Sequence, residues 1–100
     1  MALYSAITIN DVSKQLALNI RNNSDKSVAI NKIEVYEKGV IATTYTKDKL
    51  IDNKIATDIN SYGNLGMSIS YKTGIWLYNN YIKYYIECNG HLYECKIDVN

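Results

Sequence analysis

Apolar and polar residues alternate along most of this chain, in short stretches separated by turn-forming residues. Such alternation predicts β-strands with one buried face, because successive side chains of a strand point to opposite sides. Strands are predicted at residues 4–9, 15–21, 28–35, 40–45, 65–71, 81–88 and 91–99. A stretch of about eleven residues with a 3.6-residue apolar period is not found, so any helix is expected to have at most one or two turns.

Two of these segments carry further information. The apolar residues of the stretch 28–35 switch from even to odd positions after Ile30. A shift of one residue would turn every side chain to the wrong face, so we predict a β-bulge near Asn31-Lys32. Residues 46–60 are polar and only weakly periodic, and we expect a loop there with one short strand around Ile55 to Ile59.

The strongest local signal is Asn89-Gly90 between two alternating runs, which is typical of a two-residue hairpin loop with positive φ at both positions. Such a loop sets the pairing of the two strands: Cys88 with His91, Ile86 with Tyr93, Tyr84 with Cys95, and Ile82 with Ile97. One face of the hairpin is then apolar, and the other carries Lys83, Glu87, Glu94, Lys96 and Asp98 together with Tyr81, Tyr85 and Leu92.

The same hairpin holds both cysteines and the single histidine, in the segment ECNGHLYEC. In the predicted register Cys95 is offset from the partner of Cys88 by four residues, or about 13 Å. A disulfide needs α-carbons within about 7 Å, so both cysteines are expected to be free and apolar. The paired cysteines and second histidine of a zinc site are missing, so no metal site is expected at Cys88 and His91.

Composition and charge disfavour several classes of function. The 100 residues suffice for one domain, residues 1–100, and the net charge of +1 disfavours nucleic acid as the main partner. We find no membrane-spanning run and no signal peptide, which predicts synthesis in the cytoplasm. Ile, Asn, Lys and Tyr are abundant while Phe and Pro are absent, a composition that indicates an A/T-rich genome.

No enzyme motif is present, and neither a catalytic residue nor a cofactor is predicted. The aspartates between Asp48 and Asp58 lack the alternating oxygen ligands, central Gly and closing Glu of a calcium loop, so a solvated loop is favoured. Aromatic residues are the better candidates for function. Exposed Tyr and Trp are enriched where proteins bind partners, which makes a candidate interface of Trp76, Tyr78, Tyr81 and Tyr85. The alternative for Trp76 is a place in the core of the sandwich.

The order of these parts resembles an immunoglobulin-like antiparallel β-sandwich of about seven strands. The stretch LALNIRNNSDKSVAINKIEVY is similar to the strand, turn and strand that open many bacterial and viral members, SYGNLGMSISY to their glycine-containing turn and following strand, and YIKYYIECNGHLYECKIDV to their closing hairpin. The chain departs from antibody domains because both cysteines fall in one hairpin. An eight-stranded jelly roll or small barrel would show a similar alternation.

This resemblance and the A/T-rich composition imply a non-enzymatic structural protein. We expect an auxiliary or decoration protein on the capsid of a tailed, crAss-like bacteriophage, present in the virion in many copies and binding neighbouring capsid subunits. The alternative is a carbohydrate-binding or adhesion module that stacks sugar rings on Trp76 and nearby tyrosines. A third possibility is a subunit of a larger assembly whose edge strand, residues 40–45, adds to a partner's sheet.

Overall fold

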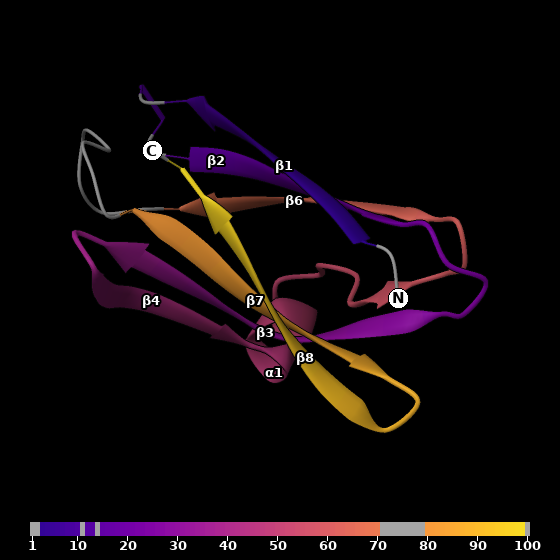
Figure 1. The fold of residues 1–100 in the computed structure, drawn as a ribbon. Coiled ribbons are helices and arrows are strands. Elements are labelled where there is room, and N and C mark those ends of the chain that lie inside the picture. Colours follow the sequence, from indigo (N-terminus) through magenta and orange to yellow (C-terminus); the bar gives the residue numbers. More distant parts are fainter. Residues whose placement is uncertain (1–2, 11, 14, 71–79, 100) are drawn as a thin grey trace.

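The computed structural model describes residues 3–10, 12–13, 15–70 and 80–99, which fold into two layered antiparallel sheets (Figure 1). Its elements in chain order are β1 (Leu3–Asn10), β2 (Gln15–Asn22), β3 (Val28–Glu37), β4 (Val40–Thr46), α1 (Lys47–Asp52), β5 (Asp58–Ile59), β6 (Asn64–Ser70), β7 (Tyr81–Cys88) and β8 (His91–Asp98). The apolar run from Ile75 to Tyr78, which holds Trp76, lies outside the described residues.

One sheet has the strand order β1-β2-β6 and the other β4-β3-β7-β8, with β5 paired to the start of β3. All these pairs are antiparallel. The all-β sandwich predicted from the sequence is therefore confirmed. Each of the seven predicted strands is present, and the two-residue β5 makes an eighth within the segment for which a short strand was expected.

The core lies between the two sheets and consists of the apolar residues on their facing sides. It is built from Leu16, Leu18, Ile20, Val28, Ile30, Ile33, Val35, Leu50, Ile59, Leu65, Met67, Ile69, Ile82, Tyr84, Ile86 and Cys88. In β2, β6 and β7 these residues occupy every second position, as the alternation predicts. The Tyr84 hydroxyl donates a hydrogen bond to Ser5 Oγ at 3.0 Å and so ties β7 to β1 across the sandwich.

The predicted bulge in β3 is confirmed at Asn31. Ile30 pairs with Ile86 and Lys32 pairs with Tyr85, so Asn31 is the extra residue. Its side-chain amide donates a hydrogen bond to Glu87 Oε1 at 2.6 Å, which fixes the bulge to the neighbouring strand. The bulge keeps apolar residues from both halves of β3 on the core side.

The β7–β8 hairpin has the predicted register, with Cys88 opposite His91 and Tyr84 opposite Cys95. Asn89 and Gly90 have φ of 52° and 79°, as a two-residue loop of this kind requires. A second such loop joins β3 to β4 at Lys38-Gly39, with φ of 56° and 79°. The sequence does not predict this loop, because lysine seldom adopts positive φ and gives no turn signal.

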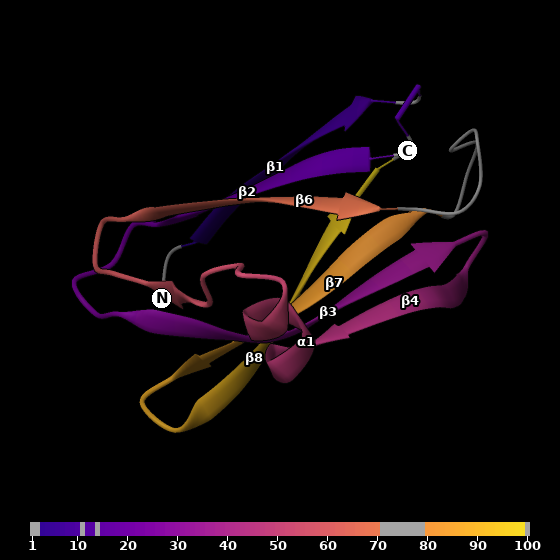
Figure 2. The ribbon, with the colours of Figure 1, turned by 180° about the vertical axis from the view of Figure 1, so that it is seen from behind.

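The segment 46–60 differs from the expected loop. It contains the six-residue helix α1, within the predicted limit of one or two turns, and the chain then runs on to β5 (Figure 2). Thr46 caps the helix by accepting a hydrogen bond from the Lys49 amide, and Leu50 is buried in the core. A helix this short has one apolar anchor and no repeat, so its period could not be recognised.

Asn22 is fully buried at the end of β2 and holds two loops together. Its amide nitrogen donates to the carbonyl oxygens of Lys26, Ile59 and Asn60 at 2.7, 3.3 and 3.2 Å. Its side-chain oxygen accepts hydrogen bonds from the amide and hydroxyl of Ser24 at 3.1 and 2.7 Å. This side chain therefore links the β2–β3 loop to the chain around the end of β5.

We predict that Asn22→Ala lowers the free energy of unfolding by about 2–3 kcal/mol, because buried backbone carbonyls lose their donor. The melting temperature should fall by about 10 °C or more in a domain of this size. The matched control is Asn23→Ala, since Asn23 is exposed and accepts a hydrogen bond from Arg21 Nε. Thermal denaturation followed by circular dichroism measures both, and equal stability of the two variants would contradict the proposed role of Asn22.

Candidate protein-interaction face

The outer face of the β4-β3-β7-β8 sheet carries a cluster of long side chains, which we name the tyrosine–lysine face. Its members are Lys32, Glu34 and Tyr36 on β3, Tyr81, Lys83 and Tyr85 on β7, and Glu94 and Lys96 on β8. Strand alternation places them on the side opposite the core, and the cross-strand register sets Lys32 beside Tyr85 and Tyr36 beside Tyr81. The bulge at Asn31 is what brings the β3 members onto this face.

The tyrosine rings of this face contact each other and the lysines. The rings of Tyr36 and Tyr81 are stacked, with centroids 4.5 Å apart and an interplanar angle of 15°. The ammonium groups lie over the rings at short centroid distances: Lys32 over Tyr85 at 4.7 Å, Lys83 over Tyr36 at 5.3 Å, and Lys96 over Tyr81 at 4.3 Å. Such cation–π contacts stabilise partly exposed sites by about 0.5–1 kcal/mol each.

Tyr85 lies at the centre of a hydrogen-bond network. Its hydroxyl is 2.8 Å from Glu34 Oε1 and 3.0 Å from Glu94 Oε1. These hydrogen bonds, above all the one to Glu34, together with partial burial, raise the pKa of the phenol well above its ordinary value. The Glu34 carboxylate, although on the outer face, is itself nearly buried and also has Lys32 Nζ at 3.6 Å.

The ion pairs of the face are modest contributors to stability. Lys83 Nζ lies 3.5 Å from Glu94 Oε1, and Lys96 Nζ lies 3.4 Å from Asp98 Oδ1, on partly exposed side chains. Exposed pairs of this kind contribute about 0–1 kcal/mol. Their role here is to limit the conformations of the lysines that cover the tyrosine rings.

The structure brings together two of the four candidate interface residues. Tyr81 and Tyr85 lie on this face, both half-buried, while Trp76 and Tyr78 lie outside the described residues. The sequence analysis missed Tyr36 and the β3 residues beside it. The predicted bulge carried the signal, because extending the shifted alternation through Tyr36 places that residue on the outer side with Lys32.

The tyrosine rings are poorly placed for stacking against sugars. Tyr81 already has Tyr36 stacked on it and the Lys96 ammonium over it, and Tyr85 is covered by Lys32. A sugar ring would have to displace one of these neighbours. In the described part of the chain, the face is therefore better suited to contact with a protein surface that leaves these neighbours in place, since tyrosine is enriched at protein interfaces.

The side chains of Cys88, Cys95 and His91 do not form a metal-binding or reactive site. Cys88 and Cys95 are free thiols, and burial raises the pKa of Cys95, which disfavours its reactive thiolate form. Cys88 faces the core, while His91, its cross-strand neighbour, is exposed. Within the described residues there is no group of three His, Cys, Asp or Glu side chains that could hold a metal ion.

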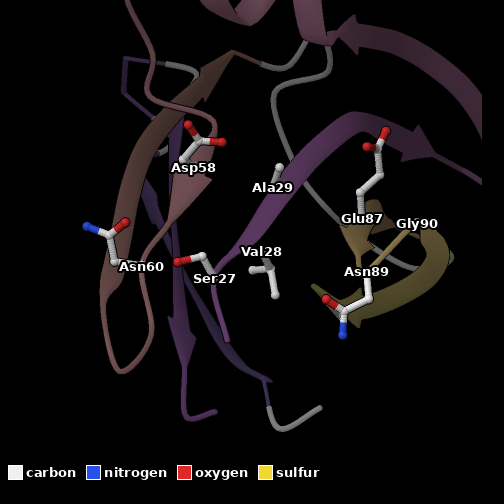
Figure 3. Close-up of a pocket in the computed structure, with 8 residues that line it drawn as sticks. All are labelled: Ser27, Val28, Ala29, Asp58, Asn60, Glu87, Asn89 and Gly90. Carbon is white, nitrogen blue, oxygen red and sulfur yellow. The ribbon is translucent and has the colours of Figure 1, made fainter. Parts of the chain in front are cut away.

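A cavity of about 400 Å³ lies near the β7–β8 turn, between β5 and the hairpin. Figure 3 shows the carboxylates of Asp58 and Glu87 on opposite sides of Ala29, with the amides of Asn60 and Asn89 pointing away from them. Ala29 on β3 pairs with Asp58 on one side and with Glu87 on the other. Asp58 and Glu87 are therefore separated by two strand spacings of about 4.8 Å each. These side chains do not converge on a common point as catalytic or metal-binding groups do.

Comparison of the chain with models of protein families, with curated proteins and with solved structures found no match. In the ranges described by the structure, no helix is long and apolar enough to cross a membrane. The interpretation of the tyrosine–lysine face therefore rests on its own geometry.

We predict that Tyr85→Phe lowers the free energy of unfolding by about 1–2 kcal/mol, because the nearly buried Glu34 carboxylate loses a donor. Tyr93→Phe is the matched control, since no hydrogen bond of the Tyr93 hydroxyl is found among the described residues. Urea denaturation measures both variants. A loss no greater for Tyr85→Phe than for Tyr93→Phe would show that the network adds nothing to stability.

The raised pKa of Tyr85 also predicts a dependence of stability on pH. The unfolded chain releases this proton near pH 10, while the folded protein still holds it. The free energy of unfolding contributed by Tyr85 should therefore be fully present below about pH 10 and fall as the pH rises above it. Denaturation at a series of alkaline pH values should show a smaller loss for Tyr85→Phe than for the original protein, and identical losses would contradict the assignment.

Proposed function

We propose that this chain is a non-enzymatic structural protein that docks onto other proteins through the tyrosine–lysine face. The observation that carries the proposal is the prior ordering of that face, in which stacked rings, lysines and carboxylates hold one another in place. Each long side chain that becomes fixed on binding loses conformational entropy, which weakens binding. In this face the side chains are already restrained in the free protein, so less entropy is lost when a partner binds. Tyrosine is also among the residues that contribute most to binding at protein interfaces.

The partner that we propose is the capsid of a tailed bacteriophage, with this protein as an auxiliary or decoration subunit present in many copies on the virion. This part of the proposal is supported by the resemblance and the A/T-rich composition of the sequence. A rigid sandwich that spans neighbouring capsid subunits would bury about 800 Å² on each partner in an interface of ordinary size. The buried area would stabilise the shell against expansion.

The first test of the capsid role is where the protein is found. Mass spectrometry should recover the chain with purified particles from its native source, in a fixed ratio to the main capsid protein. Recovery in the soluble lysate alone would overturn the capsid role. Docking onto a different protein through the tyrosine–lysine face would then still have to be tested.

The second test is binding to capsids that lack the protein, followed by sedimentation. Lys96→Glu replaces the ammonium over the Tyr81 ring by a carboxylate and should weaken binding by about tenfold or more if Tyr81 contacts the capsid. Thr8→Glu is the matched control, because Thr8 lies on the outer face of the other sheet and is exposed. Equal binding by both variants would exclude the tyrosine–lysine face as the docking surface, and no sedimentation of the unsubstituted protein would exclude the capsid.

A further inference from the structure

Among the described residues, the strand β6 forms one edge of its sheet, because β2 is the one strand paired with it there. The Asn22 amide donates to the Gly63 carbonyl at 2.9 Å, and this pair continues the β2–β6 register. Residues whose backbone groups bond to a given neighbour alternate along an antiparallel strand. Leu65, Met67 and Ile69 therefore bond to β2, and the backbone groups of Asn64, Gly66, Ser68 and Ser70 point to the free edge.

A side-chain contact supports this assignment. The Tyr45 hydroxyl donates to the Ser70 carbonyl oxygen at 3.4 Å, from the side opposite β2. Gly66 and Ser68 are exposed, and no described residue bonds to their outward N–H and C=O groups. A cavity of about 490 Å³ lies beside this edge and is lined by Ser68 and Ser70 together with Tyr45, Lys49, Asn53 and Ile55.

Sheet edges are usually protected from pairing by charged residues, proline or bulges. β6 (NLGMSIS) has no charge and no proline, and its register with β2 is unbroken over seven residues. The opposite edge of the same sheet, β1 (LYSAITIN), likewise has no charge, no proline and an unbroken register. The two edge strands of the β4-β3-β7-β8 sheet differ from both. β8 carries Glu94, Lys96 and Asp98, and β4 has a register shift beside Ala42, which breaks the regular edge that sequence analysis proposed for pairing.

We propose that β6 pairs in antiparallel orientation with β6 of a second copy of this chain. The sequence of the strand makes it self-complementary about Met67, so that Gly66 lies opposite Ser68 of the second copy and Asn64 opposite Ser70. All four residues have backbone groups that point outward, as a hydrogen-bonded pair requires. The Ser70 carbonyl oxygen already accepts from Tyr45 and would accept a second hydrogen bond from Asn64 of the other copy. The result is a symmetric dimer with one continuous six-stranded sheet, β1-β2-β6-β6-β2-β1.

The side chains of this edge fit such a pairing. Asn64, Gly66, Ser68 and Ser70 face outward from the sandwich and are small or uncharged, so the two-fold axis brings no like charges together. The β1 and β2 residues of the same outer face are also mostly small or neutral, and Arg21 is their charged member. An edge contact buries little surface, so the dimer is expected to be weak and reversible.

Amide hydrogen exchange measured by NMR tests the mode of pairing directly. In dilute protein, the amides of Leu65, Met67 and Ile69 should be protected, and those of Gly66 and Ser68 should exchange fast. Raising the concentration from about 10 µM to about 1 mM should protect Gly66 and Ser68 in parallel with dimer formation in sedimentation velocity.

Ser68→Pro is the variant that tests the hydrogen bonds of the proposed dimer. The proline ring removes the outward N–H of Ser68 and leaves the β2–β6 hydrogen bonds intact, and proline is tolerated at sheet edges. By symmetry the dimer loses two hydrogen bonds, so its dissociation constant should rise at least about tenfold. Ser68→Ala keeps the amide and is the control, with little change expected. Circular dichroism confirms that both variants are folded.

Several outcomes would overturn the proposal. They include a monomer at every concentration, and Gly66 and Ser68 amides that are already protected in dilute protein. Protection of Ser5 and Ile7 instead would place the contact at β1, whose free-edge residues these are by the same alternation. The dimer does not depend on the capsid role, because both measurements use the purified chain alone.

Discussion

The tyrosine–lysine face depends on a single extra residue in β3. The apolar residues of β3 occupy even positions before Asn31 and odd positions after it. Because Asn31 is an extra, unpaired residue, the apolar residues of both halves face the core. Without it, Lys32 and Glu34 would turn inward, and charged groups without partners are costly in a core. The hydrogen bond from Asn31 to Glu87 fixes the bulge where β3 meets β7. The core and the outer face of this sheet are therefore consequences of the same local irregularity.

The two outer faces of the sandwich have different chemistry. The β4-β3-β7-β8 face carries tyrosines interleaved with lysines and carboxylates, held together by stacking, cation–π contacts and hydrogen bonds. The β1-β2-β6 face carries side chains that are mostly small or neutral, with Arg21 as its charged member. The first suits docking by side chains, and the second ends in an edge that offers backbone hydrogen bonds. The docking and the dimer that we propose would therefore use different faces and different kinds of contact.

The loops are set by a few polar residues whose role depends on burial. Asn22 is one of two adjacent asparagines in a polar run, and its neighbour Asn23 is exposed. Only the packing of the β5–β6 connection against the end of β2 turns Asn22 into a buried link between loops. Turn propensity does not distinguish these two residues, and the signal in the sequence is the alternation of β2, which places Asn22 on the core side after Ile20.

The sequence alone determined the strands with clear alternation, the bulge at Asn31, and the register of the β7–β8 hairpin. These features are local, since side-chain period and the Asn89-Gly90 turn act within a few residues. It also placed Tyr81 and Tyr85 on the polar side of the hairpin. The tertiary structure decided that Tyr36 joins them, that α1 forms around the buried Leu50, and that β6 ends its sheet. Each of these depends on which strands are neighbours, and neighbours distant in sequence are chosen by the packing of the whole core.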